Sequence, residues 1–252
     1  MNDKPATLTG AALIFLGVYL NIPFSILGAI FNYPDVLRKP TAEVLTQFHA
    51  GGTGLLAAWY AFAAAPLLML FVVLLVDRMM RHEKPALLAI AKTAGVLAAV
   101  LQLLGLIRWV FVVPYLAEVF TDPAATQAGR DAAVVVFQAL HRYAGVAIGE
   151  HLGQLFTAVW GLSVSAAMFD SRIFSRRLGA IGVATSLAML LGLIEGFSTV
   201  VDFDASLFGK LQMASFIALS LWMIAVGIHC LRSNRRSRRT PATAPNRLAG
   251  NQ

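Results

Sequence analysis

The chain has 252 residues, of which 58% are hydrophobic and only 13% are charged. A soluble domain carries roughly a quarter of its residues as Asp, Glu, Lys and Arg, so this composition leaves too little polar surface to wet a globule. It excludes a disordered chain, a secreted disulfide scaffold and an ordinary cytosolic enzyme, and it indicates a multi-pass membrane protein. The single cysteine, Cys230, excludes an intramolecular disulfide.

The net charge of +7 would suggest a nucleic-acid partner if the protein were soluble. In a membrane protein, an excess of Lys and Arg more often records the bias of these residues toward the cytoplasmic side. We therefore expect the lipid bilayer, and not nucleic acid, to be the main partner of the chain.

Six apolar stretches are each near the roughly 20 residues that a helix needs to cross a hydrocarbon core about 30 Å thick. The sequence therefore predicts an all-α fold, an integral membrane bundle of six transmembrane helices. The first stretch is too long for the core of a signal peptide and is expected to be an uncleaved span. The six predicted spans are Leu8–Phe31, Gly54–Val76, Leu87–Val110, Val146–Phe169, Leu178–Phe197 and Leu211–Leu231.

The basic residues predict the orientation of these spans. An even number of spans places both termini on one side of the membrane. The two terminal segments and the even-numbered loops hold 13 of the 20 basic residues, whereas the odd-numbered loops hold five. Because Lys and Arg concentrate in cytoplasmic loops, the N- and C-termini are predicted to lie in the cytoplasm.

The first and third loops are long enough to hold short extracytoplasmic helices. In the first loop, a proline and a threonine precede a helix-like run, Ala42–Ala50, which a glycine pair can close. In the third loop, Asp131–Tyr143 has helical character, and a break near Gly145 or Gly149 is expected before the fourth span. These helices could cover the bundle or lie in the interface as amphipathic connectors.

Two regions of the chain differ in composition. Residues 1–231 are expected to form one transmembrane domain. Residues 232–252 form a basic tail, rich in Ser, Thr and Pro, which is expected to be disordered and cytoplasmic. Its arginines would favour anionic lipid by about 1 kcal/mol each near the membrane surface, and enforcement of the topology explains them equally well.

A few polar side chains lie within the predicted spans, where an unpaired charge is costly. Lys92 and His229 are near cytoplasmic ends and can reach the interface. The others come from five non-adjacent stretches of sequence and fall in one layer, the outer third of the membrane. They are Asn21, Arg108, Glu150, His151, Glu195 and Gln212, and Trp59 and Tyr60 enter the second span at the same level.

This layer predicts a polar pocket that faces outward. Arg108 can form an ion pair with Glu150 or Glu195, and one arginine facing two carboxylates would leave the site net negative. Our working hypothesis is a protein that binds or senses a small or amphipathic ligand. Arg108 would hold an anionic head group or clamp the carboxylates, and aromatic rings would offer a stacking wall. The candidate ligand-binding residues are Arg108, Glu150, His151 and Glu195, with Asn21, Trp59 and Tyr60 lining the pocket.

Two other functions are compatible with the same residues. The protein could be an intramembrane enzyme that uses Glu150 or His151 as a base, or a structural scaffold in which the polar layer only braces the helices. No residue is assigned a catalytic role. Four histidines and carboxylates lie on the outer side, but no HExxH or HxxxH spacing occurs, so we expect no metal and no cofactor.

Several passages together resemble a known family. They are the run from Phe31 to Pro40, the segment Thr41–Leu45, the pair Gly51-Gly52 before Ala58-Trp59-Tyr60, and Gly149-Glu150-His151. With six spans, the chain resembles the bacterial membrane proteins grouped as domain of unknown function 4386, over most of its length up to Leu231. The resemblance implies a six-helix protein of the bacterial cytoplasmic (inner) membrane, and it implies no activity, cofactor or ligand.

Overall fold

The computed structural model describes residues 4–80, 83–171 and 173–239, and no strand occurs among them. Elements η1 and η3 are 3₁₀-helices, and η2 is a π-helix. In chain order the elements are α1 (Lys4–Tyr19), α2 (Asn21–Phe31), η1 (Asp35–Arg38), α3 (Thr41–Met80), α4 (Pro85–Phe111), α5 (Val113–Thr121), α6 (Gln127–Leu140), η2 (His141–Leu152), α7 (Gly153–Met168), α8 (Arg176–Gly192), η3 (Leu193–Thr199) and α9 (Ser206–Arg239).

Six helical stretches of the described chain are long and apolar enough to cross a membrane. Each overlaps one predicted span, which confirms the prediction of an all-α bundle with six transmembrane helices. All six are longer than predicted because the helices continue past the apolar run into more polar sequence. The stretches are Ala6–Phe31, Thr41–Met80, Pro85–Thr121, Gln127–Met168, Arg176–Thr199 and Ser206–Ser233.

The helical segments of the first and third loops are not separate from the spans. The run Ala42–Ala50 is the first part of α3, which continues through a bend at Gly52. Gly52 has a φ of 55° and a ψ of −149°, a conformation open to glycine alone, so one helical run ends at this kink and a second continues from it to Met80. In the third loop, α6 leads directly into η2 and α7, and a π-helix of 12 residues stands where we predicted a break.

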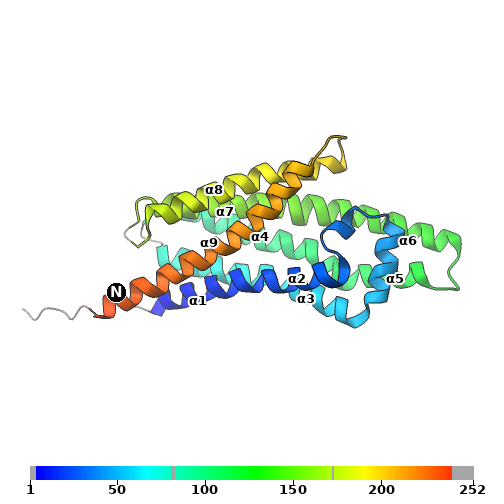
Figure 1. The fold of residues 1–252 in the computed structure, drawn as a ribbon, viewed down its shortest axis with the longest axis horizontal. Coiled ribbons are helices and arrows are strands. Elements are labelled where there is room, and N and C mark those ends of the chain that lie inside the picture. The colour runs from blue at the N-terminus through cyan, green and yellow to red at the C-terminus, as the bar shows by residue number, and fades with distance from the viewer. Residues whose placement is uncertain (1–3, 81–82, 172, 240–252) are drawn as a thin grey trace, which may run out of the picture.

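The six spans pack in sequence order around a ring. Helix α1 packs against α3, α3 against α4, α4 against α7, α7 against α8, and α8 against α9, which returns to α1. Figure 1 shows one elongated bundle, with α5 and α6 at the end opposite the N-terminus. This arrangement lets all six spans face a common interior.

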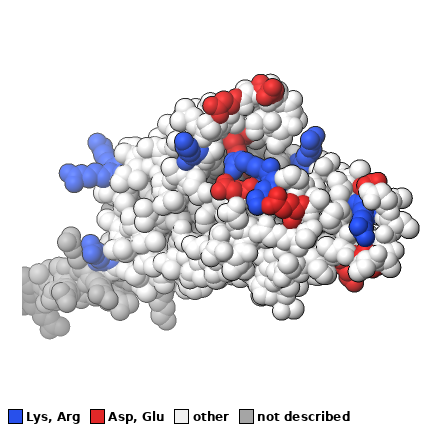
Figure 2. All heavy atoms as spheres, turned by 45° about the vertical axis from the view of Figure 1, so that its right-hand side comes forward, with Lys and Arg blue, Asp and Glu red and all other residues white. Residues whose placement is uncertain are grey.

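Large apolar side chains cover the outside of the bundle. Phe15, Phe71, Phe111 and Leu221, from four different spans, each expose more than half of their surface. On the face drawn in Figure 2, broad uncharged surface surrounds a cluster in which acidic and basic side chains meet. Such a surface is suited to contact with lipid tails, which are as apolar as these side chains.

The buried apolar residues form two clusters. The first includes Leu13, Val73 and Trp160, and the second includes Phe31, Trp59 and Trp109. Each cluster draws on several spans, so the two together hold the ring of helices closed at two levels.

The last helix extends beyond the predicted domain boundary. Helix α9 continues to Arg239, past residue 231, because Arg is a good helix former and does not interrupt it. The remainder of the predicted tail, residues 240–252, lies outside the described residues.

Candidate functional site

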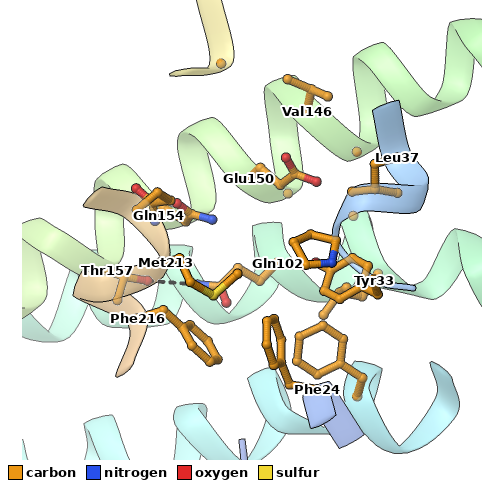
Figure 3. A pocket seen from close by; sticks show the side chains of 18 of the residues that line it. Phe24, Tyr33, Leu37, Gln102, Val146, Glu150, Gln154, Thr157, Met213 and Phe216 are labelled. Atoms are coloured by element: carbon orange, nitrogen blue, oxygen red, sulfur yellow. Dashed lines mark hydrogen bonds between the residues drawn. The ribbon is translucent and has the colours of Figure 1, made fainter. Parts of the chain in front are cut away.

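A cavity of about 310 Å³ lies inside the ring, and its walls come from all six spans. Residues of both apolar clusters border it, for example Met223 of the first and Phe62 of the second. Figure 3 shows polar side chains from α4, η2 and α7 on one side of this space and aromatic side chains on another. The polar and charged lining residues include Arg38, Gln102, Arg108, His141, Glu150, Gln154, Thr157, Glu195 and Gln212.

Arg108 of α4 is held against η2 by a neighbouring glycine. A Cβ atom at Gly145 would lie 2.6 Å from Cζ of Arg108, so a side chain at this position would displace the guanidinium. Nη1 of Arg108 donates to the carbonyl of Gly105, and Nη2 lies 3.4 Å from Nδ1 of His141. The side chain is only 7% exposed, and its guanidinium lies 5.3 Å from the ring centre of Trp109. Its direct contacts are therefore a carbonyl and two rings, and the charge of Glu150 acts on it from further away.

A second glycine contact brings the backbones of α4 and η2 together. A Cβ atom at Gly149 would lie 2.8 Å from Cα of Gly105, so neither position accepts a side chain without a shift. One turn further, Nε2 of Gln102 donates to Oγ1 of Thr157 over 2.8 Å and to the carbonyl of Gly153 over 3.3 Å. Close approach through small residues and interhelical hydrogen bonds are typical of membrane helix pairs. These contacts fix the wall that carries Glu150.

Glu150 lies on the π-helix, and its half-buried carboxylate projects into the cavity in Figure 3. Within the described part of the chain it has no hydrogen bond and no ion pair. Single turns of π-helix often occur at functional sites because the wider turn redirects a side chain. Arg108 and Arg38 act on its charge from beyond ion-pair distance, so Glu150 is the lining glutamate that has no direct contact partner in the described chain.

Glu195 of η3 reaches the same cavity but is paired with Arg38. Nη2 of Arg38 lies 2.7 Å from Oε1 of Glu195, and Nη1 of Arg38 lies 3.3 Å from Asp35. The ion pair that we predicted between Arg108 and a carboxylate does not form in the described structure, because Arg108 is turned toward His141 and Gly105. Two arginines and two glutamates line the cavity, so their formal charges balance, and the predicted excess of negative charge is wrong.

Four aromatic rings form one wall of the cavity, the aromatic wall, which consists of Phe24, Tyr33, Phe62 and Phe216. Phe24 contacts Tyr33 edge-to-face at 5.5 Å between ring centres and Phe216 at 5.4 Å. Burial raises the pKa of the Tyr33 phenol above its ordinary value, and the negative charge of Glu150 raises it further. The phenol therefore stays protonated at neutral pH.

The other four candidate residues do not line the cavity. His151, next to Glu150, turns toward Phe197, with 5.2 Å between ring centres. Nδ2 of Asn21 donates to the carbonyl of Gly17 over 2.7 Å. Trp59 is fully buried behind the wall, stacked on Trp109 at 4.3 Å, and Tyr60 is 61% exposed.

Four residues that sequence reasoning did not select border the cavity from the segment between the first two spans: Tyr33, Pro34, Leu37 and Arg38. Helix α2 ends at Asn32, which has a left-handed φ of 53°, and the chain then turns back so that Tyr33 and Arg38 reach the interior. An asparagine after an apolar helix is a signal for such a helix end. It predicts the turn but not the direction in which the following side chains point.

The described residues contain no group of three or more His, Cys, Asp or Glu side chains placed to hold a metal ion. His141 interacts with Arg108 and stacks on Phe137, and His151 contacts Phe197. The chemistry that this site offers is recognition by charge, hydrogen bonds and aromatic contact.

Comparisons with known proteins identify the family of the chain. No curated protein and no solved structure matches the chain significantly. One family profile, described as domain of unknown function (DUF4386), matches residues 8–231, a range that covers the six spans except for two residues at each outer end. The chain therefore belongs to the DUF4386 family.

Proposed function

We propose that this protein binds an amphipathic small molecule in the cavity at the centre of the bundle. The observation that carries the proposal is a single cavity of about 310 Å³ that has charged groups and aromatic or aliphatic groups on different walls. Ligand sites in proteins are typically concave, largely apolar and supplied with a few polar groups that orient the ligand.

The apolar part of the ligand would lie against Phe24, Phe216, Met213 and Met223. Methionine side chains adapt to irregular shapes, which suits a pocket for a flexible apolar group. The polar part would face Glu150 and the neighbouring amide side chains. This division is the reason for proposing an amphipathic ligand rather than a fully polar solute.

We also propose that the protein resides in a bacterial inner membrane with both termini in the cytoplasm. The support for this location is the split of basic residues, 13 on the side of the termini against five on the other side. In this orientation the end of the bundle that carries Arg38 and Glu195 faces outward, and a ligand would enter from the outer leaflet or from outside the cell.

The test is retention of a molecule by the purified full-length chain. Native mass spectrometry after mild detergent extraction should detect an added mass in the wild type. Met213→Trp should remove that mass, because Met213 projects into the cavity and a larger ring fills the space. Ile217→Trp is the matched control, one turn further along α9 with 47% of its side chain exposed on the outside. Equal retention by both variants, or none in the wild type, would overturn the proposal.

A further inference from the structure

The charged groups of the cavity differ in how completely they are satisfied. Glu195 is already neutralised by Arg38 at 2.7 Å. Arg108 is almost completely buried. Two of its nitrogens face the Gly105 carbonyl and His141, and Nε has no hydrogen-bond partner in the described chain but is enclosed and out of reach of a ligand. Glu150 has neither an ion pair nor a hydrogen bond among the described residues, although its carboxylate lies at the cavity surface. The charge that the protein leaves available to a ligand is therefore negative.

The charges of Arg108 and Arg38 act on Glu150 only from beyond ion-pair distance. A half-buried carboxylate without a partner in direct contact has lost water and is only partly compensated. A bound cation would compensate for the lost contact with water. An anionic ligand would instead have to approach Arg108, whose guanidinium is enclosed by Gly145, the Trp109 ring and the His141 ring. The accessible geometry thus favours a cation.

The aromatic wall supplies the second half of such a site. Figure 3 shows Glu150 on one side of the cavity, with Tyr33 and Phe24 on another. Aromatic faces attract cations through the negative charge of their π electrons, and this attraction is stronger away from water. The effect of the Glu150 charge on the Tyr33 pKa places the phenol within electrostatic range of this carboxylate.

We propose that the ligand is an organic cation: a positively charged nitrogen, as in an amine or a quaternary ammonium group, attached to an apolar body. The nitrogen pairs with Glu150 and lies near Tyr33 and Phe24, and the apolar body extends along the rest of the aromatic wall toward Met213. This inference rests on the proposed function, since it names the chemistry of a ligand for the same cavity.

Three probes of nearly equal size distinguish the possible head groups. They are 4-phenylbutylamine, 4-phenylbutanol and 4-phenylbutyrate, which share an apolar body and carry a positive, neutral or negative group at neutral pH. Isothermal titration calorimetry on the full chain in nanodiscs, with protein-free nanodiscs as the reference, measures the affinity of each probe. We expect the amine to bind about tenfold more tightly than the alcohol, as one charge-assisted hydrogen bond provides, and the acid to bind most weakly.

Substitutions connect this preference to one carboxylate. Glu150→Gln should lower the affinity for the amine about tenfold and leave the affinity for the alcohol unchanged. Glu118→Gln makes the same chemical change at an exposed position on α5, away from the cavity, and should retain the preference for the amine. Because the ranking of the three probes is measured on the wild type, the proposal stays testable even where Glu150→Gln does not fold.

The outcomes separate this inference from the proposed function. Binding of the acid or the alcohol as tight as that of the amine, with loss of binding in Met213→Trp, would leave the cavity a ligand site and overturn the choice of a cation. Preference for the amine that persists in Glu150→Gln would also overturn it. Absence of binding for all three probes would overturn the cation proposal, whereas retention of another molecule in native mass spectrometry would preserve the proposed function.

Discussion

Nη2 of Arg38 lies 2.7 Å from Oε1 of Glu195, which joins the segment before α3 to the 3₁₀-helix after α8 at the border of the cavity. The two residues are 157 positions apart in the chain. The Arg38 side chain is 60% exposed and that of Glu195 is 30% exposed, so water competes with the contact. The ion pair therefore contributes little to the stability of the fold, and its main effect is to neutralise the charge of Glu195.

The first prediction concerns the strength of this pair. Arg38→Ala and Glu195→Gln should each change the free energy of unfolding by less than about 1 kcal/mol, and a double-mutant cycle should give a coupling of about 0.2 to 1 kcal/mol. Chemical unfolding of the four proteins in one detergent measures both quantities. Added salt should reduce the coupling, because exposed charges are screened. A coupling several times larger would mean that the pair is far more enclosed than its exposure indicates.

The second prediction tests the backbone contact between α4 and η2. Gly149→Ala places a Cβ atom 2.8 Å from Cα of Gly105, and overpacking of this kind destabilises a protein by about 1 to 3 kcal/mol. Gly54→Ala is the control, since a Cβ atom there would meet nothing within 4 Å. Because alanine is the better helix former, this control should unfold at the same temperature as the wild type or at a higher one.

The spans and part of the site could be predicted from the sequence because the apolar interior of a membrane favours apolar side chains and penalises polar ones. A polar side chain in an apolar span is costly, so its presence implies a neighbouring polar group or space. Arg108, Glu150 and Glu195 satisfied this reasoning, and all three line one cavity. The predicted pairing failed because it overlooked Arg38, whose loop could turn toward the bundle or away from it.

The rotation of each helix was harder to predict than its position. Spans that are apolar all round carry no clear periodic signal for the face that points inward. Adjacent residues point about 100° apart on a helix, so Trp59 and Tyr60 face different directions, and neither lines the cavity. Between Glu150 and His151 the choice depended on a π-helix, whose different turn no spacing rule in this sequence revealed.

The third prediction concerns alkaline pH. Burial, and then the charge of Glu150, raises the pKa of Tyr33 in the folded protein, whereas the unfolded chain has the ordinary value near 10. As the pH rises above that value, the unfolded state loses a proton that the folded state keeps, so stability should fall. The stability that the Tyr33 proton contributes is fully present below pH 10, and it is lost as the pH approaches the pKa of Tyr33 in the folded protein.

Tyr33→Phe removes this proton and should make stability less sensitive to alkaline pH. Thermal unfolding measures the difference in pH sensitivity between the wild type and the variant. It is followed at several pH values between about 9 and 11, on either side of the ordinary tyrosine pKa. Tyr60→Phe is the matched control, because the Tyr60 ring is exposed on the outside of the bundle. Equal pH dependence in all three proteins would show that Tyr33 has no raised pKa.

The fourth prediction tests the orientation that we propose. A reporter that is active only in the cytoplasm should be active when fused after Gln252, and one that is active only outside should be active when inserted in the connection between α5 and α6, near Ala125. The physical reason is that Lys and Arg in short loops resist transfer across the membrane, and the terminal side carries most of them. Replacing Arg78, in the last turn of α3, and Lys84, directly before α4, by Gln weakens this bias. That variant should therefore shift activity toward the opposite reporter pattern, and the reverse pattern in the wild type would place the cavity border on the cytoplasmic side.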